Sequence, residues 1–204
     1  ARFEPVMLSE VCADLRSEAD DGAHRDDALV VGFIGAARTQ VEQMTRRSLV
    51  ARRLRVSYDG WPTCGVRLWR PPVLRVIAVR RMEDGEMVEV DDWTVTDEQI
   101  PRLRFVNGRA PAVLDAPEIE YEAGYAPAGS PPTTQADFTA NIPRPLKDAI
   151  LLGVQLLYDT LAPDQRDRIE RTRDALISPF RVLIVSACAA TSILNRLTSA
   201  YAAS

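Results

Sequence analysis

The side chains that could carry chemistry in this sequence are few and scattered. The single histidine, His24, lies in a polar, turn-like stretch, and the three cysteines, Cys12, Cys64 and Cys188, are far apart and form no C-x-x-C pair. A zinc site needs several Cys, His or carboxylate ligands brought together, so none is expected here. We interpret His24 as an exposed loop residue rather than the base of a catalytic triad, and Cys12 as a small core residue.

The motifs that cradle phosphates or activate a nucleophile are also missing. The sequence contains no Walker loop, no G-x-G-x-x-G and no G-x-S-x-G. The adjacent acids Asp91 and Asp92 are explained by a solvated hairpin region. We therefore predict no catalytic residue, no metal and no cofactor, and expect a protein that is not an enzyme. A small enzyme of unrecognised type is kept as the last of three hypotheses for the function, the other two being introduced below.

Charge is strongly segregated along the middle of the chain. Between Arg46 and Arg81 there are ten arginines and one acid, Asp59. The following stretch, Glu83 to Glu98, holds eight acids and no basic residue. This segregation favours either internal pairing within a small sheet or two complementary surfaces that meet between molecules.

The same arginines leave a nucleic-acid function open as an alternative. Tyr58, Trp61 and Trp69 are interleaved with them, and arginines near aromatic rings suit a phosphate-contacting surface. The formal net charge of −4 and the absence of a helix-turn-helix or RNA-binding motif argue against this interpretation. A DNA-binding accessory protein is therefore the second hypothesis.

Length and composition are those of a soluble globular protein. The chain has 204 residues, of which 46% are hydrophobic and 26% charged. It contains no apolar run of the roughly 18 residues that a membrane span requires. Its first residues, ARFEPVMLSE, lack the basic-then-apolar layout of a signal peptide. We expect synthesis in the cytoplasm and no membrane partner.

Hydrophobic spacing predicts helices at both ends of the chain. A long amphipathic helix is predicted over residues 27–45, a short one over 9–19, and two more over 143–161 and 164–177. The predicted buried stripe of the long helix consists of Leu29, Phe33, Ala37, Val41 and Met44. Gly32 and Gly35 interrupt that helix, and each costs it about 1 kcal/mol relative to alanine. We therefore expect another helix to approach closely at these glycines.

The middle of the chain has the period of β-strands. Near-alternation of apolar and polar residues, with hairpin signals at Asp84–Gly85 and Asn107–Gly108, predicts several short antiparallel strands. The predicted fold class is therefore α+β and mainly helical: N- and C-terminal helices form a bundle, and a small antiparallel β subdomain is inserted. The predicted segments are 1–47 and 143–179 for the bundle, 48–125 for the β subdomain, 126–142 for a linker and 180–204 for a tail.

The predicted tail is apolar, which is unusual because chain ends are often polar and frayed. Residues 182–185 favour a strand, and later apolar residues share one helical face. Two interpretations stay open: the tail packs on its own core, or it docks on a partner.

Most of the chain, to about Val182, resembles the head–tail connector (adaptor) family of tailed phages and phage-like gene transfer particles. Four stretches in the same order carry the resemblance: the opening helices LSEVCADLR and DDALVVGFIGAARTQVEQMTRR, the proline-pair strand and hairpin LWRPPVLRVIAVRRMEDGE, the last strand IEYEAGYA, and the closing helices IPRPLKDAILLGVQLLYD and ALISPFRV.

The resemblance implies a structural protein of the particle neck. Such proteins form a ring, typically of twelve subunits, between the portal protein of a DNA-filled head and a tail-side neck or stopper protein. Duplex DNA passes through the lumen without sequence-specific binding. A ring needs contacts in which one surface meets a different surface of the neighbour.

Two groups of residues are assigned under this hypothesis. Their placement rests on charge segregation for the first group and on apolar content for the second. The predicted subunit-interface residues are Arg52, Arg53, Arg75, Arg80, Arg81, Glu86, Glu89 and Asp92. The predicted portal-docking residues are Phe180, Arg181, Val182, Leu183, Ile184, Val185, Ile193 and Leu197.

Overall fold

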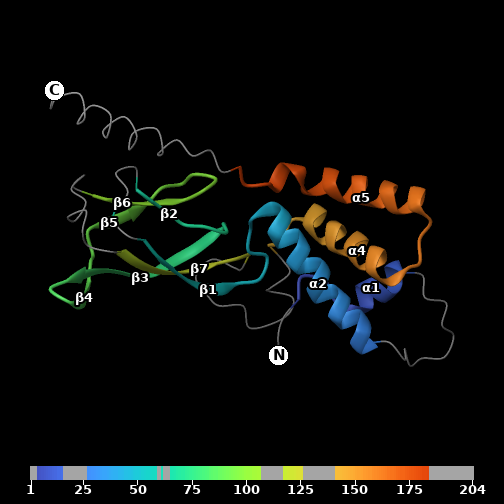
Figure 1. The fold of residues 1–204 in the computed structure, drawn as a ribbon, viewed down its shortest axis with the longest axis horizontal. Helices are drawn as coiled ribbons and strands as arrows, with labels where there is room; N and C mark the ends of the chain where they lie inside the picture. Colours follow the sequence, from blue (N-terminus) through green and yellow to red (C-terminus); the bar gives the residue numbers. More distant parts are fainter. Residues whose placement is uncertain are drawn as a thin grey trace, which may run out of the picture.

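Helices from the two ends of the chain pack together, and strands from its middle form a second part beside them (Figure 1). The computed structural model describes residues 4–15, 27–58, 61, 65–106, 117–125 and 141–183. The helices are α1 (Leu8–Asp14), α2 (Asp27–Thr45), α4 (Arg144–Tyr158), α5 (Pro163–Ile177) and the 3-10 turn η1 (Ser178–Phe180). The strands are β1 (Arg52–Ser57), β2 (Val66–Arg67), β3 (Val73–Glu83), β4 (Glu86–Glu89), β5 (Trp93–Val95), β6 (Arg102–Phe105) and β7 (Pro117–Ala123).

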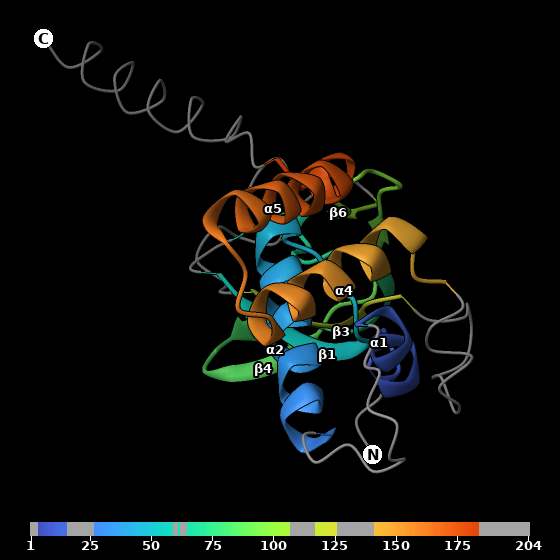
Figure 2. The ribbon, with the colours of Figure 1, turned by 90° about the vertical axis from the view of Figure 1, so that its right-hand side faces the viewer.

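One hydrophobic core joins the helices of both chain ends. It contains buried residues of α1, α2, α4 and α5, and α4 lies between α2 and α5 (Figure 2). Helices α2 and α4 approach closely at Gly153 of α4, where an added Cβ would lie 3.0 Å from the Cβ of Ala37 on α2. The absence of a side chain at Gly153 therefore sets how closely α2 and α4 pack.

The strands form two sheets rather than one. The larger has the order β1-β7-β3-β4 and the smaller the order β2-β6-β5, and every described pairing between named strands is antiparallel. A second core contains residues of both sheets, with Tyr121 and Ile119 of β7 fully buried in it. The hairpin of β3 and β4 turns at Asp84 and Gly85, which both have positive φ, as a two-residue turn between strands requires.

The predicted fold class is confirmed: an α+β chain in which a helical bundle carries an inserted antiparallel β part. The long helix begins and ends at the predicted residues. The division into two small sheets was not predicted. The described part of the chain contains no helix long and apolar enough to cross a membrane.

The predicted buried stripe of α2 is wrong at Leu29, which is 51% exposed. Ala37 and Val41 are buried as expected, and Phe33 and Met44 are partly buried against the core, but the fully buried residues of the first half are Val30 and Ile34. The expected close approach at the helix glycines is also wrong. A Cβ added at Gly32 or Gly35 would meet nothing within 4 Å.

Candidate assembly interfaces

A row of glutamates runs along one face of the larger sheet. Glu118, Glu120 and Glu122 alternate along β7 with Ile119 and Tyr121, which face the core. Because β7 lies between β1 and β3, this row is flanked on both sides by strands rich in arginine. The alternation of glutamate with apolar residues in PEIEYEA is the sequence signal that could have predicted this face.

Arginines of the flanking strands pair with the glutamate row across the strands. Arg53 Nε on β1 lies 2.6 Å from Glu120 Oε1, and Arg80 Nη1 on β3 lies 3.1 Å from Glu118 Oε1. Arg75 contacts Glu122 with two nitrogens, at 2.8 and 3.1 Å. We name this surface, made of Arg53, Arg55, Arg75, Arg80, Glu118, Glu120 and Glu122, the ladder face. Four arginines of the block are thus paired within the chain, with acids that lie outside the acidic block.

The ladder face changes the pKa values of its central carboxylates. The pKa of Glu122 is lowered by the hydrogen bond from Arg75, against a smaller opposing effect of burial. For Glu120, burial acts to raise the pKa, but Arg53, Arg55 and Arg80 together outweigh it and the pKa falls. Both side chains are therefore held in the charged form, as cross-strand ion pairs require.

The predicted subunit-interface residues divide into three groups in the structure. Arg53, Arg75 and Arg80 belong to the ladder face, whereas Arg52 contacts Glu42 and Arg81 contacts Glu83. The acids Glu86, Glu89 and Asp92 are all exposed, at or just after β4. The structure thus places arginines and acids on one sheet, but it holds one copy of the chain, and their contact across subunits stays a prediction.

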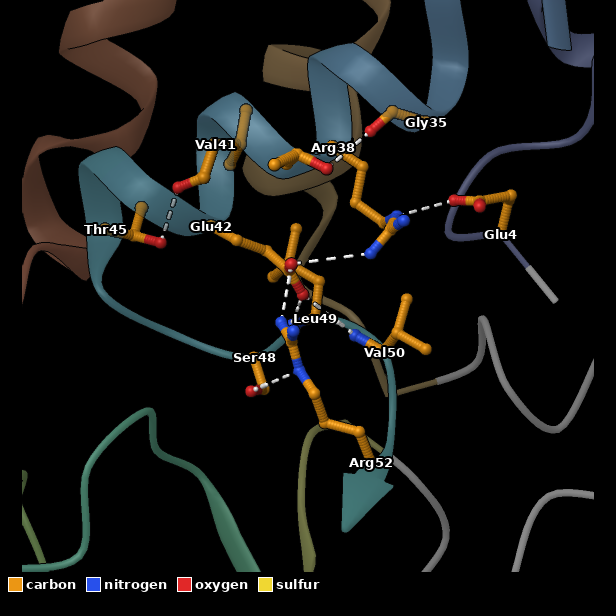
Figure 3. A network of polar contacts seen from close by, with 11 residues as sticks. Glu4, Gly35, Arg38, Val41, Glu42, Thr45, Ser48, Leu49, Val50 and Arg52 are labelled. Carbon is orange, nitrogen blue, oxygen red and sulfur yellow. Dashed lines mark hydrogen bonds and ion pairs between the residues drawn. The ribbon is translucent and has the colours of Figure 1, made fainter. Parts of the chain in front are cut away.

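The buried carboxylate of Glu42 connects the bundle to the larger sheet (Figure 3). It is 2% exposed, although sequence spacing placed it off the buried face of α2. Its Oε1 accepts the backbone N–H of Leu49 at 2.7 Å, and its Oε2 lies 2.6 Å from Arg52 Nη2 and 3.4 Å from Arg38 Nη1. A buried charge with several donors is strongly held, so Glu42 fixes how β1 leaves the bundle.

A second contact at the same junction involves backbone alone. Gly124 follows β7 with φ of 140°, and a Cβ there would lie 2.5 Å from the Cα of Ala51. Its N–H donates to the carbonyl of Pro72 at 2.9 Å. Only glycine fits so close to another backbone, so the two ends of the inserted β part are tied together where they meet the bundle.

The predicted docking tail begins inside the chain's own fold. The Phe180 carbonyl accepts a hydrogen bond from Arg47 Nε at 2.7 Å, and the Val182 N–H donates to the Thr45 carbonyl at 3.0 Å. Val182 is 4% exposed, whereas Leu183 is 75% exposed. Arg181 Nη2 lies 3.7 Å from Asp174 Oδ2 of α5. The remaining predicted docking residues, Ile184, Val185, Ile193 and Leu197, lie outside the described residues. Docking stays a prediction, and a surface for it begins at Leu183.

The aromatic residues on which the nucleic-acid alternative was based make contacts within the chain itself. Trp61 is buried and packs edge-on against Phe105, with 4.7 Å between the ring centroids. Trp69 Nε1 donates to the Tyr58 hydroxyl at 2.9 Å, and that hydroxyl donates to the Arg67 carbonyl at 2.8 Å. Trp61 is therefore unable to stack on a base, and the polar atoms of Trp69 and Tyr58 are used within the chain, so the DNA-binding alternative has less support.

The residues first considered for chemistry form no centre in the described parts of the chain. Cys12 is a half-buried free thiol rather than a fully buried core residue. His24, Cys64 and Cys188 lie outside the described residues. Within those residues, no group of three or more His, Cys, Asp or Glu side chains could hold a metal ion.

Solved structures share this fold over nearly the whole chain. A chain in the neck of an empty gene transfer agent (GTA) particle, computed with C6 symmetry, aligns with a TM-score of 0.69 at 22% identity, over 90% of this chain and 93% of that chain. A chain of the virion of a native GTA particle aligns with a TM-score of 0.68 at 22% identity, over 90% and 92% of the two chains.

A third chain comes from the neck of a native GTA particle computed with C12 symmetry. It aligns with a TM-score of 0.59 at 20% identity, over 92% of this chain and 98% of that chain. No protein-family model and no curated protein matches the sequence. The resemblance expected from the sequence is thus confirmed at the level of the fold.

Proposed function

We propose that this chain is a structural head–tail connector of a phage-like particle. In this role it forms a ring at the particle neck, between the portal of a DNA-filled head and a tail-side neck or stopper protein, and duplex DNA passes through the lumen. The observation that carries the proposal is the near full-length match, with a TM-score of 0.69, to a chain in the neck of a GTA particle.

Two further observations support a ring. The neck structures that share the fold were computed with C6 and C12 symmetry, which suits a cyclic assembly of twelve copies. The chain also exposes a basic strand and an acidic hairpin at different places on one sheet, as a head-to-tail contact needs. The ring is therefore proposed to use the acids of the β3–β4 hairpin and arginines of the larger sheet across its subunit contacts.

The proposed role does not involve catalysis or a cofactor. The ladder face is built from ion pairs that rigidify a sheet, and the Glu42 junction fixes the orientation of that sheet relative to the bundle. Both features suit a structural subunit that holds its neighbours in a fixed orientation rather than a protein that binds a small molecule. The docking of residues from Leu183 onward on the portal belongs to the same proposal.

The function is tested by removing the chain from cells that produce the particles. We expect DNA-filled heads and free tails that no longer join, and joining restored when the chain is supplied in trans. A peptide tag on the supplied chain should be seen at the neck by electron microscopy. Normally joined particles in the absence of the chain would refute the proposal.

A further inference from the structure

The larger sheet has two unpaired edges within the described residues, β1 and β4. On β1, the N–H of Tyr58 donates to Pro117 of β7 at 3.0 Å, in register with the rest of the β1–β7 ladder. Bonded positions alternate along an antiparallel strand. The backbone groups of Arg53, Arg55 and Ser57 therefore point away from β7, toward the outer edge.

The opposite edge has the same property. The N–H of Val90 donates to Val79 of β3 at 2.8 Å, which extends the β3–β4 register by one residue. By the same alternation, the backbone groups of Met87 and Glu89 point away from β3. All four residues of β4 are exposed. Such an edge is a ready template for another strand.

Charge on the ladder face alternates from strand to strand across this sheet. In the order β1, β7, β3 and β4, the charged side chains on that face are arginines, glutamates, arginines and then Glu89, which is paired in register with Arg80. The next strand in the series would again present arginines. Of the two edge strands of this sheet, the one that does so is β1, with Arg53 and Arg55.

We propose that the β4 edge of one copy pairs with the β1 edge of the next copy, so that the sheets join into one continuous antiparallel sheet around the ring. This contact rests on the proposed ring, and specifies how its subunits meet. The strand directions agree with this pairing. Because β1 and β3 both run opposite to β7, they share one direction, and β4 runs opposite to β3. β4 of one copy is therefore antiparallel to β1 of the next copy when the sheet continues.

The pairing places Glu89 beside Arg53 or Arg55 of the neighbour. The side chains of Arg53 and Arg55 are 58% and 60% exposed, and a guanidinium has donors enough to contact a second carboxylate beside Glu120. Met87, which is 41% exposed, would be covered in the same contact. Edge-to-edge pairing of different strands is heterologous, and in a closed ring it leaves no free edge.

Disulfide cross-linking of the purified full chain tests the contact directly. In a background with Cys12, Cys64 and Cys188 replaced by serine, we pair Glu89→Cys with Arg53→Cys in one variant and with Arg55→Cys in another. Paired strands bring facing Cα atoms within about 5.5 Å, a distance a disulfide can span. On oxidation, one of the two variants should form a series of disulfide-linked oligomers of increasing size. The control replaces Glu86, whose side chain is on the other face of β4, in place of Glu89.

A proline variant separates main-chain pairing from side-chain contact. Met87→Pro removes an N–H that points outward, so the hairpin keeps its own bonds, and proline is tolerated at such edge positions. We expect unfolding of the monomer at nearly the same temperature and assembly about tenfold weaker or worse. Met87→Thr keeps the N–H and should assemble.

The outcomes distinguish this contact from the proposed function. Cross-linked oligomers of a chain that is absent from particle necks would uphold the contact and refute the function. Particles that need the chain, but whose rings give no cross-link in either variant, would overturn the contact and leave the function standing. Normal assembly of Met87→Pro would overturn the edge pairing as well.

Discussion

Individual carboxylates in this chain stabilise the folded state, and this stabilisation depends on their ionisation. Glu120 and Glu122 lie under arginines on the ladder face, and their pKa values fall below the ordinary 4.5. A lowered pKa in the folded state means that the folded state binds the proton less readily than the unfolded chain. The stabilisation is therefore complete above the unfolded pKa and is lost as the pH falls through the folded one.

This gives a prediction for the pH dependence of stability. The double variant Glu120→Gln, Glu122→Gln should be less stable than the native chain at pH 7, but its stability should fall less between pH 7 and pH 3. Urea unfolding midpoints at a series of pH values measure this. Glu86→Gln, at an exposed residue without an ion pair in the described part of the chain, is the control. If the stability of the double variant and of the native chain fell equally between pH 7 and pH 3, the proposed role of the Glu120 and Glu122 carboxylates would be contradicted.

Glu42 provides a second prediction at the scale of one residue. Glu42→Ala would leave the Leu49 amide and two arginines without their buried acceptor, and should destabilise the chain by about 3 kcal/mol. Glu42→Gln keeps an oxygen for the amide and should cost about half as much. The exposed neighbour Gln43, replaced by alanine, should change stability by less than about 0.5 kcal/mol. Denaturant unfolding of the three variants tests the order.

At the scale of elements, the glycines of α2 and α4 act in opposite ways. Gly32 and Gly35 have open space around them, so alanine there should raise stability by up to about 1 kcal/mol each through helix propensity. Gly153→Ala gains the same propensity but pushes a Cβ to 3.0 Å from that of Ala37, and should lower stability. Thermal unfolding of the three single variants compares them. A stabilised Gly153→Ala would show that α2 and α4 can separate at little cost.

The same helices show what could be predicted from sequence. The bounds of α2 follow from an acidic start and a long apolar period, which are local signals. Which part of that apolar face is buried depends on where α4 packs, and this is set by the Ala37–Gly153 contact between residues far apart in the chain. Leu29 and Val30 are both apolar, so spacing alone cannot choose between them.

The ladder face shows the same limit for the strands. Several short antiparallel strands were predicted because alternation is a local signal, but strand order is not local. The order β1-β7-β3-β4 brings β7, the last of the described strands, between two arginine strands. The acids of β4, which follow the arginines in sequence, therefore lie at one edge of the sheet, and Glu118, Glu120 and Glu122 are the partners of the arginines instead.

At the scale of the whole molecule, the chain is a helical bundle joined to a sheet by the contacts of Glu42 and Gly124. The sheet reaches away from the bundle to the β3–β4 hairpin (Figure 1). The tail starts beside the junction, where Phe180 and Val182 bond to residues at the end of α2. A ring of such molecules would present every tail at an equivalent position, so weak docking of each copy would be multiplied by avidity.

The last prediction tests the tail with a matched pair of truncations. Ending the chain after Leu183 keeps Val182, whereas ending it after Arg181 removes Val182 and its bond to Thr45. Loss of this buried side chain should cost about 1.5–3 kcal/mol in the shorter variant. We expect the longer variant to unfold at nearly the native temperature.

Both truncated chains should fail to join heads to tails, because both lack the apolar residues after Leu183. The longer variant is the decisive one, since its failure could not be ascribed to a damaged core. If it unfolds at a much lower temperature than the native chain, residues 184–204 stabilise their own fold. If it joins heads to tails normally, portal docking by residues 184–204 is wrong, and the portal contact must be made by residues 1–183.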